Sequence, residues 1–297
     1  MDNYSTEKWD TEKELAFYEQ FPYPLNHSHG RTFRDYLCRL LGEIFKGRDE
    51  PVKVLDAGCG TGAVTRLLAE LLPRARIVGV DQSYRSIELA ENAHLQNVEF
   101  YHKDLCNGLA WDKQFDFVFC HGVLHHIDRM KAALETLIRS LTSDGVLYIW
   151  LYSRHGRTEI DLVRQIETKL LTANQKDVRT RIELLRTIRS YFPTLSYIEN
   201  KIVVEQSGGD EVDLNEETRF IIDRYLPPIA RHFNVTEATE LFTSCGLRVE
   251  SIPQFDWMEI DKDLSRLKQV RREDVLKYYA ICEMLNRPSG IGYVLRI

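Results

Sequence analysis

The stretch that decides the fold is Val54-Leu55-Asp56-Ala57-Gly58-Cys59-Gly60-Thr61-Gly62. An apolar run passes directly into glycines at alternate positions, and an amphipathic stretch from Ala63 to Leu72 follows. This order predicts a buried strand, a tight turn and a helix. Glycine permits the tight turn and lets a ligand approach the backbone where a Cβ would clash. Because the first N–H groups of a helix form a positive end, the segment predicts a unit that binds a ligand.

Carboxylates mark the ends of three successive predicted strands. Asp56 precedes the first glycine, Asp81 ends the run 76–81, and Asp104 follows the run 98–103. Asp56 would repel a pyrophosphate but would hold a cationic amino-acid tail, directly or through water. The two oxygens of Asp81 can accept both hydroxyls of a ribose. Asp104 is placed either to meet an adenine amino group or to cap a turn, so the set predicts a nucleoside site without phosphate.

Apolar runs and amphipathic stretches alternate on both sides of this unit. Continuous apolar strands separated by helices predict a parallel sheet covered on both faces, the doubly wound α/β class. The alternation stops after Tyr152 and resumes at Thr236. The expected strands are 52–57, 76–81, 98–103, 115–120, 146–151, 247–252 and 291–297, and the expected helices outside the gap are 63–72, 84–95, 128–141, 236–244 and 261–285.

The chain therefore divides into four segments. Residues 1–50 form an aromatic, helical N-terminal lead, and 51–152 form the ligand-binding core. Residues 153–235, with apolar residues at helical spacing, form a helical insertion that serves as a lid or as a dimerisation element. Residues 236–297 complete the core sheet. The length suggests two domains, but this division needs only one domain with additions.

The motifs of the core resemble those of the class I S-adenosylmethionine-dependent methyltransferases. Residues 56–62 match the first motif of that family, Asp81-Gln82-Ser83 the second and Lys103-Asp104-Leu105 the third. Residues 115–118 together with 123–127 match its fourth-strand segment. The turn 141–145 is also similar, with Ser143 where proline is usual. The resemblance covers about a third of the chain and implies a seven-stranded Rossmann-like methyltransferase sheet.

The resemblance also implies the cofactor and its binding residues. The cofactor is S-adenosyl-L-methionine, and its expected contacts are Asp56, Gly58, Cys59, Gly60, Gly62, Asp81, Gln82, Asp104, Leu105 and His121. Cys59 is expected to contribute its backbone only. Since the sulfonium already activates the methyl group, the protein's main task is to align a nucleophile with the methyl carbon.

Three histidines in the loop after the fourth strand are the candidates for a general base. His125 is the preferred candidate, ahead of His126 and His121. A structural hydrogen-bonding role for such a Leu-His-His segment is equally compatible with the sequence. Cys120, His121, His125, His126 and Asp128 have the spacing of no metal site, so no metal is expected.

The acceptor is expected to be held by parts outside the core. Tyr18 and Tyr23 in the lead and Tyr152 after the fifth strand are the candidate substrate-binding residues. Seven arginines in the insertion either meet an anionic acceptor or form a solvated helix face, and the sequence favours the second; they are Arg154, Arg157, Arg164, Arg179, Arg181, Arg186 and Arg189.

Composition narrows the classes of partner. A formal net charge of −6 disfavours a nucleic-acid binder, and no Asn-Pro-Pro-Tyr type of segment follows the fourth strand. No apolar run is long enough to span a membrane, and the N-terminus has no signal-peptide core. Six scattered cysteines without a Cys-x-x-Cys pair predict a reduced, cytoplasmic protein.

The sequence thus predicts an enzyme of small-molecule biosynthesis that methylates an N, O or C atom of an organic acceptor. Three alternatives stay open: a non-catalytic binder of S-adenosylmethionine with a partner role, a dinucleotide-dependent oxidoreductase, and an aminopropyl transferase. The carboxylate before Gly58 and the Gly-x-Gly-x-Gly spacing disfavour the oxidoreductase. His121-Gly122 stands where an aminopropyl transferase normally has an acidic pair.

Overall fold

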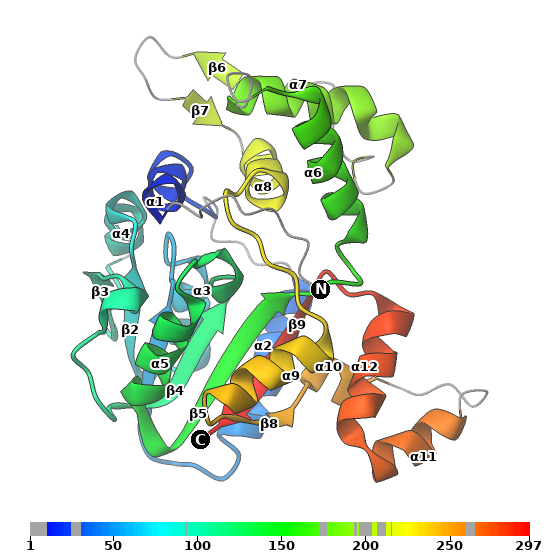
Figure 1. The fold of residues 1–297 in the computed structure, drawn as a ribbon. Helices are drawn as coiled ribbons and strands as arrows, with labels where there is room; N and C mark the ends of the chain where they lie inside the picture. The colour runs from blue at the N-terminus through cyan, green and yellow to red at the C-terminus, as the bar shows by residue number, and fades with distance from the viewer. Residues whose placement is uncertain are drawn as a thin grey trace.

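A seven-stranded sheet forms the centre of the molecule, a computed structural model that describes residues 11–24, 31–92, 94–172, 177–192, 195, 204–206, 212–214, 216–258 and 265–297 (Figure 1). The strand order is β3-β2-β1-β4-β5-β9-β8. The strands are β1 (Lys53–Ala57), β2 (Arg76–Asp81), β3 (Val98–His102), β4 (Phe115–His121), β5 (Leu141–Tyr152), β8 (Arg248–Ser251) and β9 (Gly290–Arg296).

The sheet is parallel except at one edge. Strands β1 to β5 pair in parallel, whereas β9 pairs antiparallel with β5 and with β8. The strand order reverses between β1 and β4, and ligands of such sheets bind outside the carboxyl ends of the strands at this point. The predicted doubly wound seven-stranded fold is confirmed, with every predicted strand present. The predicted turn at residues 143–145 lies within β5, where the register shifts between Phe115 and Phe117.

Helices cover both faces of this sheet. One apolar cluster joins the sheet to α5 (Met130–Ser140), α9 (Val235–Ser244) and α12 (Val275–Asn286). A second joins the opposite face to α2 (Arg31–Ile44) and α3 (Ala63–Leu71). At the β2–β3 side lies α4 (Tyr84–Glu91), whose predicted N-cap is confirmed because the Ser83 hydroxyl accepts a hydrogen bond from the Ser86 N–H at 3.0 Å.

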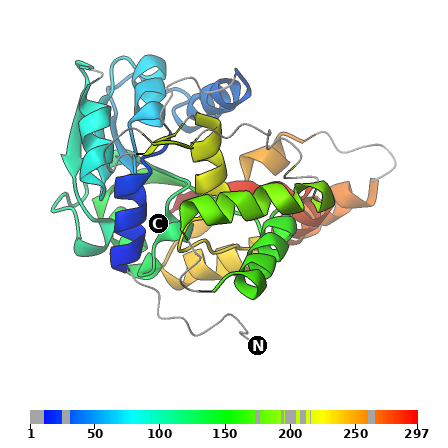
Figure 2. The ribbon, with the colours of Figure 1, turned by 90° about the horizontal axis from the view of Figure 1, so that it is seen from above.

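The remaining described elements either lie beyond the carboxyl ends of the strands or belong to the C-terminal part of the chain. Figure 1 shows α1 (Thr11–Gln20), α6 (Thr158–Leu170), α7 (Val178–Ile188) and α8 (Glu216–Tyr225) grouped above the sheet, and Figure 2 shows them from above. A hairpin of β6 (Val204–Gln206) and β7 (Val212–Leu214) was not predicted. The predicted helix 261–285 is two helices where described, α11 (Ser265–Glu273) and α12, with Asp274 capping the second, and a short α10 (Pro253–Asp256) precedes them.

A third apolar cluster holds these upper elements together. It joins Phe21 of the lead to Ile160 of α6, Ile182 of α7 and Ile221 of α8, all at most 4% exposed. Its described members come from the lead and the insertion, with none from the sheet. The lead and the insertion therefore pack on each other and form one roof over the carboxyl ends of the strands, which are called the sheet edge below.

Candidate active site

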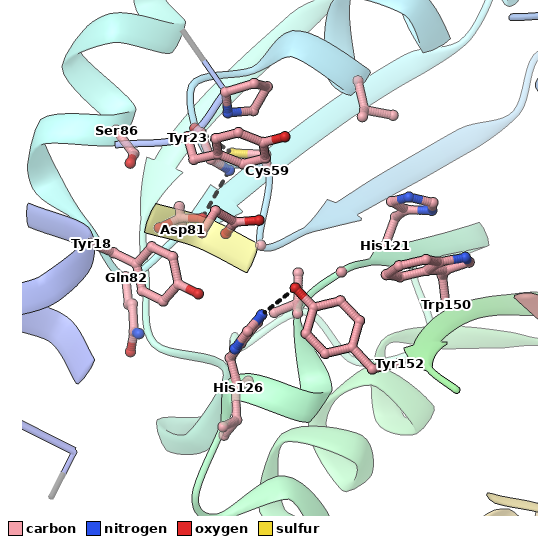
Figure 3. A pocket seen from close by; sticks show the side chains of 18 of the residues that line it. Tyr18, Tyr23, Cys59, Asp81, Gln82, Ser86, His121, His126, Trp150 and Tyr152 are labelled. Atoms are coloured by element: carbon pink, nitrogen blue, oxygen red, sulfur yellow. Dashed lines mark hydrogen bonds between the residues drawn. The ribbon is translucent and has the colours of Figure 1, made fainter. Parts of the chain in front are cut away.

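A cavity of about 480 Å³ lies between the carboxyl ends of the strands and this roof (Figure 3). Its floor is formed by residues at the ends of β1 to β5, and its roof by residues of α1, of α8 and of the segment just before α6. The lining comprises Tyr18, Tyr23, Pro24, Phe33, Gly58, Cys59, Gly60, Val64, Asp81, Gln82, Ser86, Lys103, Asp104, Leu105, His121, Gly122, Val123, His126, Ile127, Trp150, Tyr152, Arg157, Phe220, Asp223, Arg224 and Ser289.

The glycine loop after β1 takes a shape that other residues rarely adopt. Gly58 and Gly60 have φ of 78° and 53°, in the left-handed region. The N–H groups of Gly58 and Cys59 both donate to the Val80 carbonyl, at 2.8 and 2.9 Å, which fixes the loop against β2. A Cβ at Gly60 would lie 2.5 Å from the Tyr23 carbonyl oxygen. The loop therefore fits closely beneath the lead, with its backbone open to the cavity.

Asp81 links this loop to the end of β2. One carboxylate oxygen accepts the Gly60 N–H and the other accepts the Ser83 N–H, both at 2.9 Å. Burial raises the pKa of Asp81, and these two hydrogen bonds lower it again. Because a carboxylate oxygen accepts more than one hydrogen bond, both oxygens keep capacity for ribose hydroxyls.

Asp56 and Gly62 lie behind the loop, outside the cavity lining. Asp56 is 3% exposed and accepts a hydrogen bond from the Thr65 hydroxyl at 2.6 Å. Burial raises its pKa to about 7. A Cβ at Gly62 would press on Ala90 and Phe100, so this glycine allows helix α3 to pack closely. The cofactor contacts expected of these two residues, which for Asp56 are either direct or through water, stay predictions.

Asp104 has the capping role that the sequence left open for its position, and its contact with an adenine amino group stays a prediction. It lines the cavity, and its carboxylate caps the next turn by accepting the Cys106 N–H at 2.7 Å. Gln82, Leu105 and Cys59, which are also expected to contact the cofactor, line the cavity as well. Burial and the neighbouring Asp81 hold the pKa of the Cys59 thiol well above its usual value, so the thiol stays protonated.

The three candidate bases occupy three different environments. His125 is fully buried outside the lining, and its ring lies 3.6 Å from that of Tyr152. His126 lines the cavity, where its Nδ1 lies 2.6 Å from the Ile229 carbonyl oxygen and its Nε2 lies 3.2 Å from the Tyr152 hydroxyl (Figure 3). His121 lines the cavity and stacks on Trp150 with ring centroids 4.8 Å apart.

Burial makes His125 and His126 weak bases in this state. It lowers the pKa of His126 to about 3 and that of His125 well below the usual range. Since a carbonyl only accepts hydrogen bonds, His126 donates from Nδ1, and its Nε2 accepts from Tyr152. His126 therefore makes the structural hydrogen bonds that the sequence left open for the Leu-His-His segment, and it holds Tyr152 in one orientation.

The comparison with known families identifies this arrangement. A family model described as "Methyltransferase domain" matches residues 48–203, more than half of the chain. The chain belongs to the methyltransferase family. The predicted family and its cofactor, S-adenosylmethionine, are confirmed. The loop after β1 and the carboxylates at the ends of β2 and β3, which are expected to bind this cofactor, line the cavity.

Individual relatives agree with this assignment. An uncharacterised protein of Synechococcus sp. is 28% identical over 200 residues, which cover 66% of this chain and 47% of the relative. The trans-aconitate 2-methyltransferase of Azoarcus sp. is 31% identical over 159 residues, 53% of this chain and 56% of that enzyme. The methyltransferase thus spans about half the length of these curated relatives.

A solved structure shows the same fold. PKMT2 from Rickettsia typhi in complex with AdoHcy superposes with a TM-score of 0.61, over 100% of this chain and 54% of that chain. The identity between them is 17%. In the described part of the methyltransferase, no helix is long and apolar enough to cross a membrane.

The residues proposed for the acceptor, Tyr18, Tyr23 and Tyr152, all line the cavity. Other residues in the part of the cavity proposed to hold the acceptor were not predicted from the sequence. They are Trp150 at the end of β5, Phe220, Asp223 and Arg224 on α8, and Arg157 before α6, whose position in the cavity lining was not predicted. The arginines predicted to form a solvated face differ from one another. Arg179 is exposed, whereas Arg157 is 4% exposed and Arg164 donates to the carbonyls of Tyr225 and Pro227.

Proposed function

We propose that this chain transfers the methyl group of S-adenosylmethionine to a small organic molecule held under the roof. The observation that carries the proposal is the continuity of the cavity. It extends from Asp81 and the glycine loop at the sheet edge to Tyr152 and Arg157 beneath α6 and α8. A donor bound at the strand ends and an acceptor bound under the roof would share one enclosed space.

The fit of the cofactor rests on the chain's own groups. Asp81 would bind the ribose, and Asp104 and Leu105 would contact the adenine. The backbone of Gly58 and Gly60 would lie against the amino-acid tail, where a side chain has no room. Asp56, behind the loop, would act on the positive tail through its charge or through water. When bound, S-adenosylmethionine supplies a methyl group made electrophilic by the adjacent sulfonium.

The described residues of the cavity act by binding and orientation. Tyr152 is held by His126, and its ring is covered by the Arg157 guanidinium at 3.1 Å from the ring centroid. A nucleophile of the acceptor would form a bond to the methyl carbon as the carbon–sulfur bond breaks, and sulfur would keep the electron pair. Because His125 and His126 are neutral and fully engaged or enclosed, an acceptor that is already nucleophilic suits this cavity best.

The roof supports the predicted role of the insertion as a lid. Its apolar side chains pack within the chain, on Phe21 of the lead and on one another. Arg157, Phe220 and Arg224 contribute directly to the cavity wall. A roof of this kind excludes water from the reacting groups.

Ligand-dependent thermal unfolding tests the proposal. S-adenosylmethionine and S-adenosylhomocysteine should each raise the melting temperature, whereas NAD should not, because only the first two carry the cationic or neutral amino-acid tail without phosphate. Stabilisation by NAD alone would contradict the proposal. Turnover is then tested with trans-aconitate, the acceptor named for the Azoarcus relative, and with other small organic acids. Failure of every tested acceptor in the presence of bound donor would favour a non-catalytic binder.

A further inference from the structure

Arg157 is a buried cation in the wall of the cavity. It immediately precedes α6 and is 4% exposed. Its Nε donates to the Ser289 carbonyl at 3.0 Å, which fixes the guanidinium over the ring of Tyr152. Its Nη1 is also buried but has no hydrogen-bond partner among the described residues. The guanidinium is therefore fixed in place, and the two N–H donors of Nη1 lack an acceptor.

An unused donor on a buried guanidinium is costly. Taking a charged group out of water without full compensation costs several kcal/mol, and natural proteins rarely leave such donors unpaired. Burial lowers the pKa of Arg157, and the neighbouring Tyr152 and Asp223 partly offset this shift. Arginine nevertheless stays charged at physiological pH. Arg157 lines the cavity, and this position indicates that a ligand bound there supplies the missing acceptor.

The charges around Arg157 limit the charge of that ligand. Arg224 adds a second positive charge to this wall of the cavity, and Asp223 adds a negative one. Together with Arg157 they sum to one positive charge at neutral pH. Tyr18, Trp150, Tyr152 and Phe220 make the surrounding surface largely aromatic. This environment is complementary to a singly charged anion on an organic frame.

We propose that Arg157 binds a carboxylate of the methyl acceptor through Nη1, so that the acceptor is an organic acid. This inference rests on the proposed function, because it concerns the acceptor half of the same cavity. A guanidinium matches the geometry of a carboxylate, and the net single charge disfavours a phosphate dianion beside Asp223. Arg157 is thus a binding and specificity-determining residue of the acceptor site.

The carboxylate of the cofactor is the competing occupant. The cofactor's amino-acid tail belongs at the glycine loop after β1, whereas Arg157 is held by Ser289 and Tyr152, at β5 and next to β9. In the sheet order, β4 separates β1 from β5, and β9 lies on the other side of β5. This separation favours the acceptor as the partner of Arg157, and the affinity of S-adenosylhomocysteine distinguishes the two cases.

The test measures binding to the full chain saturated with S-adenosylhomocysteine, so that it does not depend on turnover. Benzoate, benzamide and phenyl phosphate share one ring and differ in charge, and calorimetry gives the affinity of each. The variants are Arg157→Met, the conservative Arg157→Lys, and Arg179→Met as a matched control that removes an exposed arginine of the same insertion.

We expect benzoate to bind the natural chain at least about tenfold more tightly than benzamide or phenyl phosphate. Arg157→Met should abolish that preference, Arg157→Lys should keep part of it, and Arg179→Met should keep all of it. The affinity for S-adenosylhomocysteine should stay within about threefold in every variant, which also shows that each variant is folded.

Two sets of results would overturn the inference. Equal or undetectable binding of benzoate and benzamide, or tighter binding of phenyl phosphate, would show that the wall does not select a carboxylate. A loss of S-adenosylhomocysteine affinity in Arg157→Met, with affinity for 5′-methylthioadenosine unchanged, would assign Arg157 to the cofactor tail. If the natural chain binds no S-adenosylhomocysteine, the proposed function itself fails.

Discussion

The cavity has two halves that differ in how they are built. The half at the sheet edge consists of residues that directly follow strands, such as Gly58 after β1 and Asp81 at the end of β2. The half under the roof combines Trp150 and Tyr152 at the end of β5 with residues from α1, α8 and the segment before α6. The first half carries carboxylates and exposed backbone, and the second carries aromatic rings and guanidinium groups.

This difference separates a general task from a particular one. Sheet register fixes the distance between the ends of neighbouring strands, so a donor common to a whole family can be bound there. The roof has its own packing, and its side chains can suit one acceptor. If the comparison is correct, substitutions in one half should change one ligand's binding and leave the other ligand's binding nearly intact.

The largest effect is expected from Asp81→Ala at the sheet edge. The change removes the acceptor of the Gly60 and Ser83 N–H groups as well as the proposed ribose contact. Charge-assisted hydrogen bonds contribute on the order of 1.5–3 kcal/mol each, so affinity for S-adenosylhomocysteine should fall at least about tenfold. Calorimetry measures this, and Asp144→Ala, an exposed carboxylate in β5, serves as the control. Unchanged affinity would show that the ribose lies elsewhere.

A somewhat smaller effect is expected from Gly60→Ala. An alanine at position 60 would have to adopt a left-handed φ of 53°, and its Cβ would lie 2.5 Å from the Tyr23 carbonyl oxygen. Strain of about 1–2 kcal/mol should lower the melting temperature by several degrees and weaken cofactor binding. Gly42→Ala is the matched control, because helix α2 leaves its Cβ free of contacts within 4 Å. The control should raise the melting temperature slightly, and equal effects of the two variants would refute the prediction.

Asp56→Asn tests the buried carboxylate behind the loop through its pH dependence. Burial raises the pKa of Asp56 to about 7 in the folded chain, above its value in the unfolded chain. The folded state therefore binds the proton more tightly, and the ionisation penalty is complete above about pH 7 and absent below about pH 4. In the ligand-free protein, Asp56→Asn should be more stable than the natural chain at about pH 8, by on the order of 1–3 kcal/mol, and the advantage should shrink on acidification.

Denaturant unfolding at several pH values measures that difference, with Asp144→Asn as the control for an exposed carboxyl group. A difference in unfolding free energy between the natural chain and Asp56→Asn that stays constant across the pH range would mean that burial does not raise the pKa of Asp56. If Asp56 acts on the positive tail of the cofactor, Asp56→Asn should at the same time bind S-adenosylmethionine less tightly at about pH 8.

The smallest effect is expected from Tyr152→Phe under the roof. The change leaves the buried Nε2 of His126 without its donor, 3.2 Å away, at a cost of about 1–2 kcal/mol. Benzoate affinity should fall a few-fold, while affinity for S-adenosylhomocysteine should stay within about twofold. Tyr148→Phe also removes a tyrosine hydroxyl contact of β5, the 3.1 Å one to Tyr36, away from the cavity. It should leave both affinities unchanged, and a matching loss there would indicate a general effect on folding.

The residues of the sheet edge were predictable because local patterns determine them. Glycine spacing and a carboxylate at a strand end specify a loop shape and a position at once, and the Ser83 cap follows from one hydroxyl before a helix. The burial of Asp56 was not predictable. Its orientation toward Thr65 depends on which way the strand end turns, and either orientation is compatible with the motif.

The roof was predictable in kind but not in detail. Helical periodicity predicted α6 and α7, yet the same periodicity led us to expect every arginine of the insertion on a solvated helix face. Arg157 precedes α6 and is buried only because Tyr152 and Ser289 enclose it, and Ser289 is 132 positions away in the sequence. Contacts over such separations leave no local pattern. For the same reason, the sequence did not reveal that His125 lies outside the cavity lining while its neighbour His126 lies within it.

The apolar cluster of the roof has a consequence for how the chain can change over time. Its described members are separate from the two clusters that hold the sheet. Substitutions that share no contacts have nearly additive effects on stability. A lineage can therefore remodel the surface around Arg157 and Arg224 while the donor site keeps its full strength. New acceptors become accessible by small steps, each tolerated by a scaffold that the change does not reach.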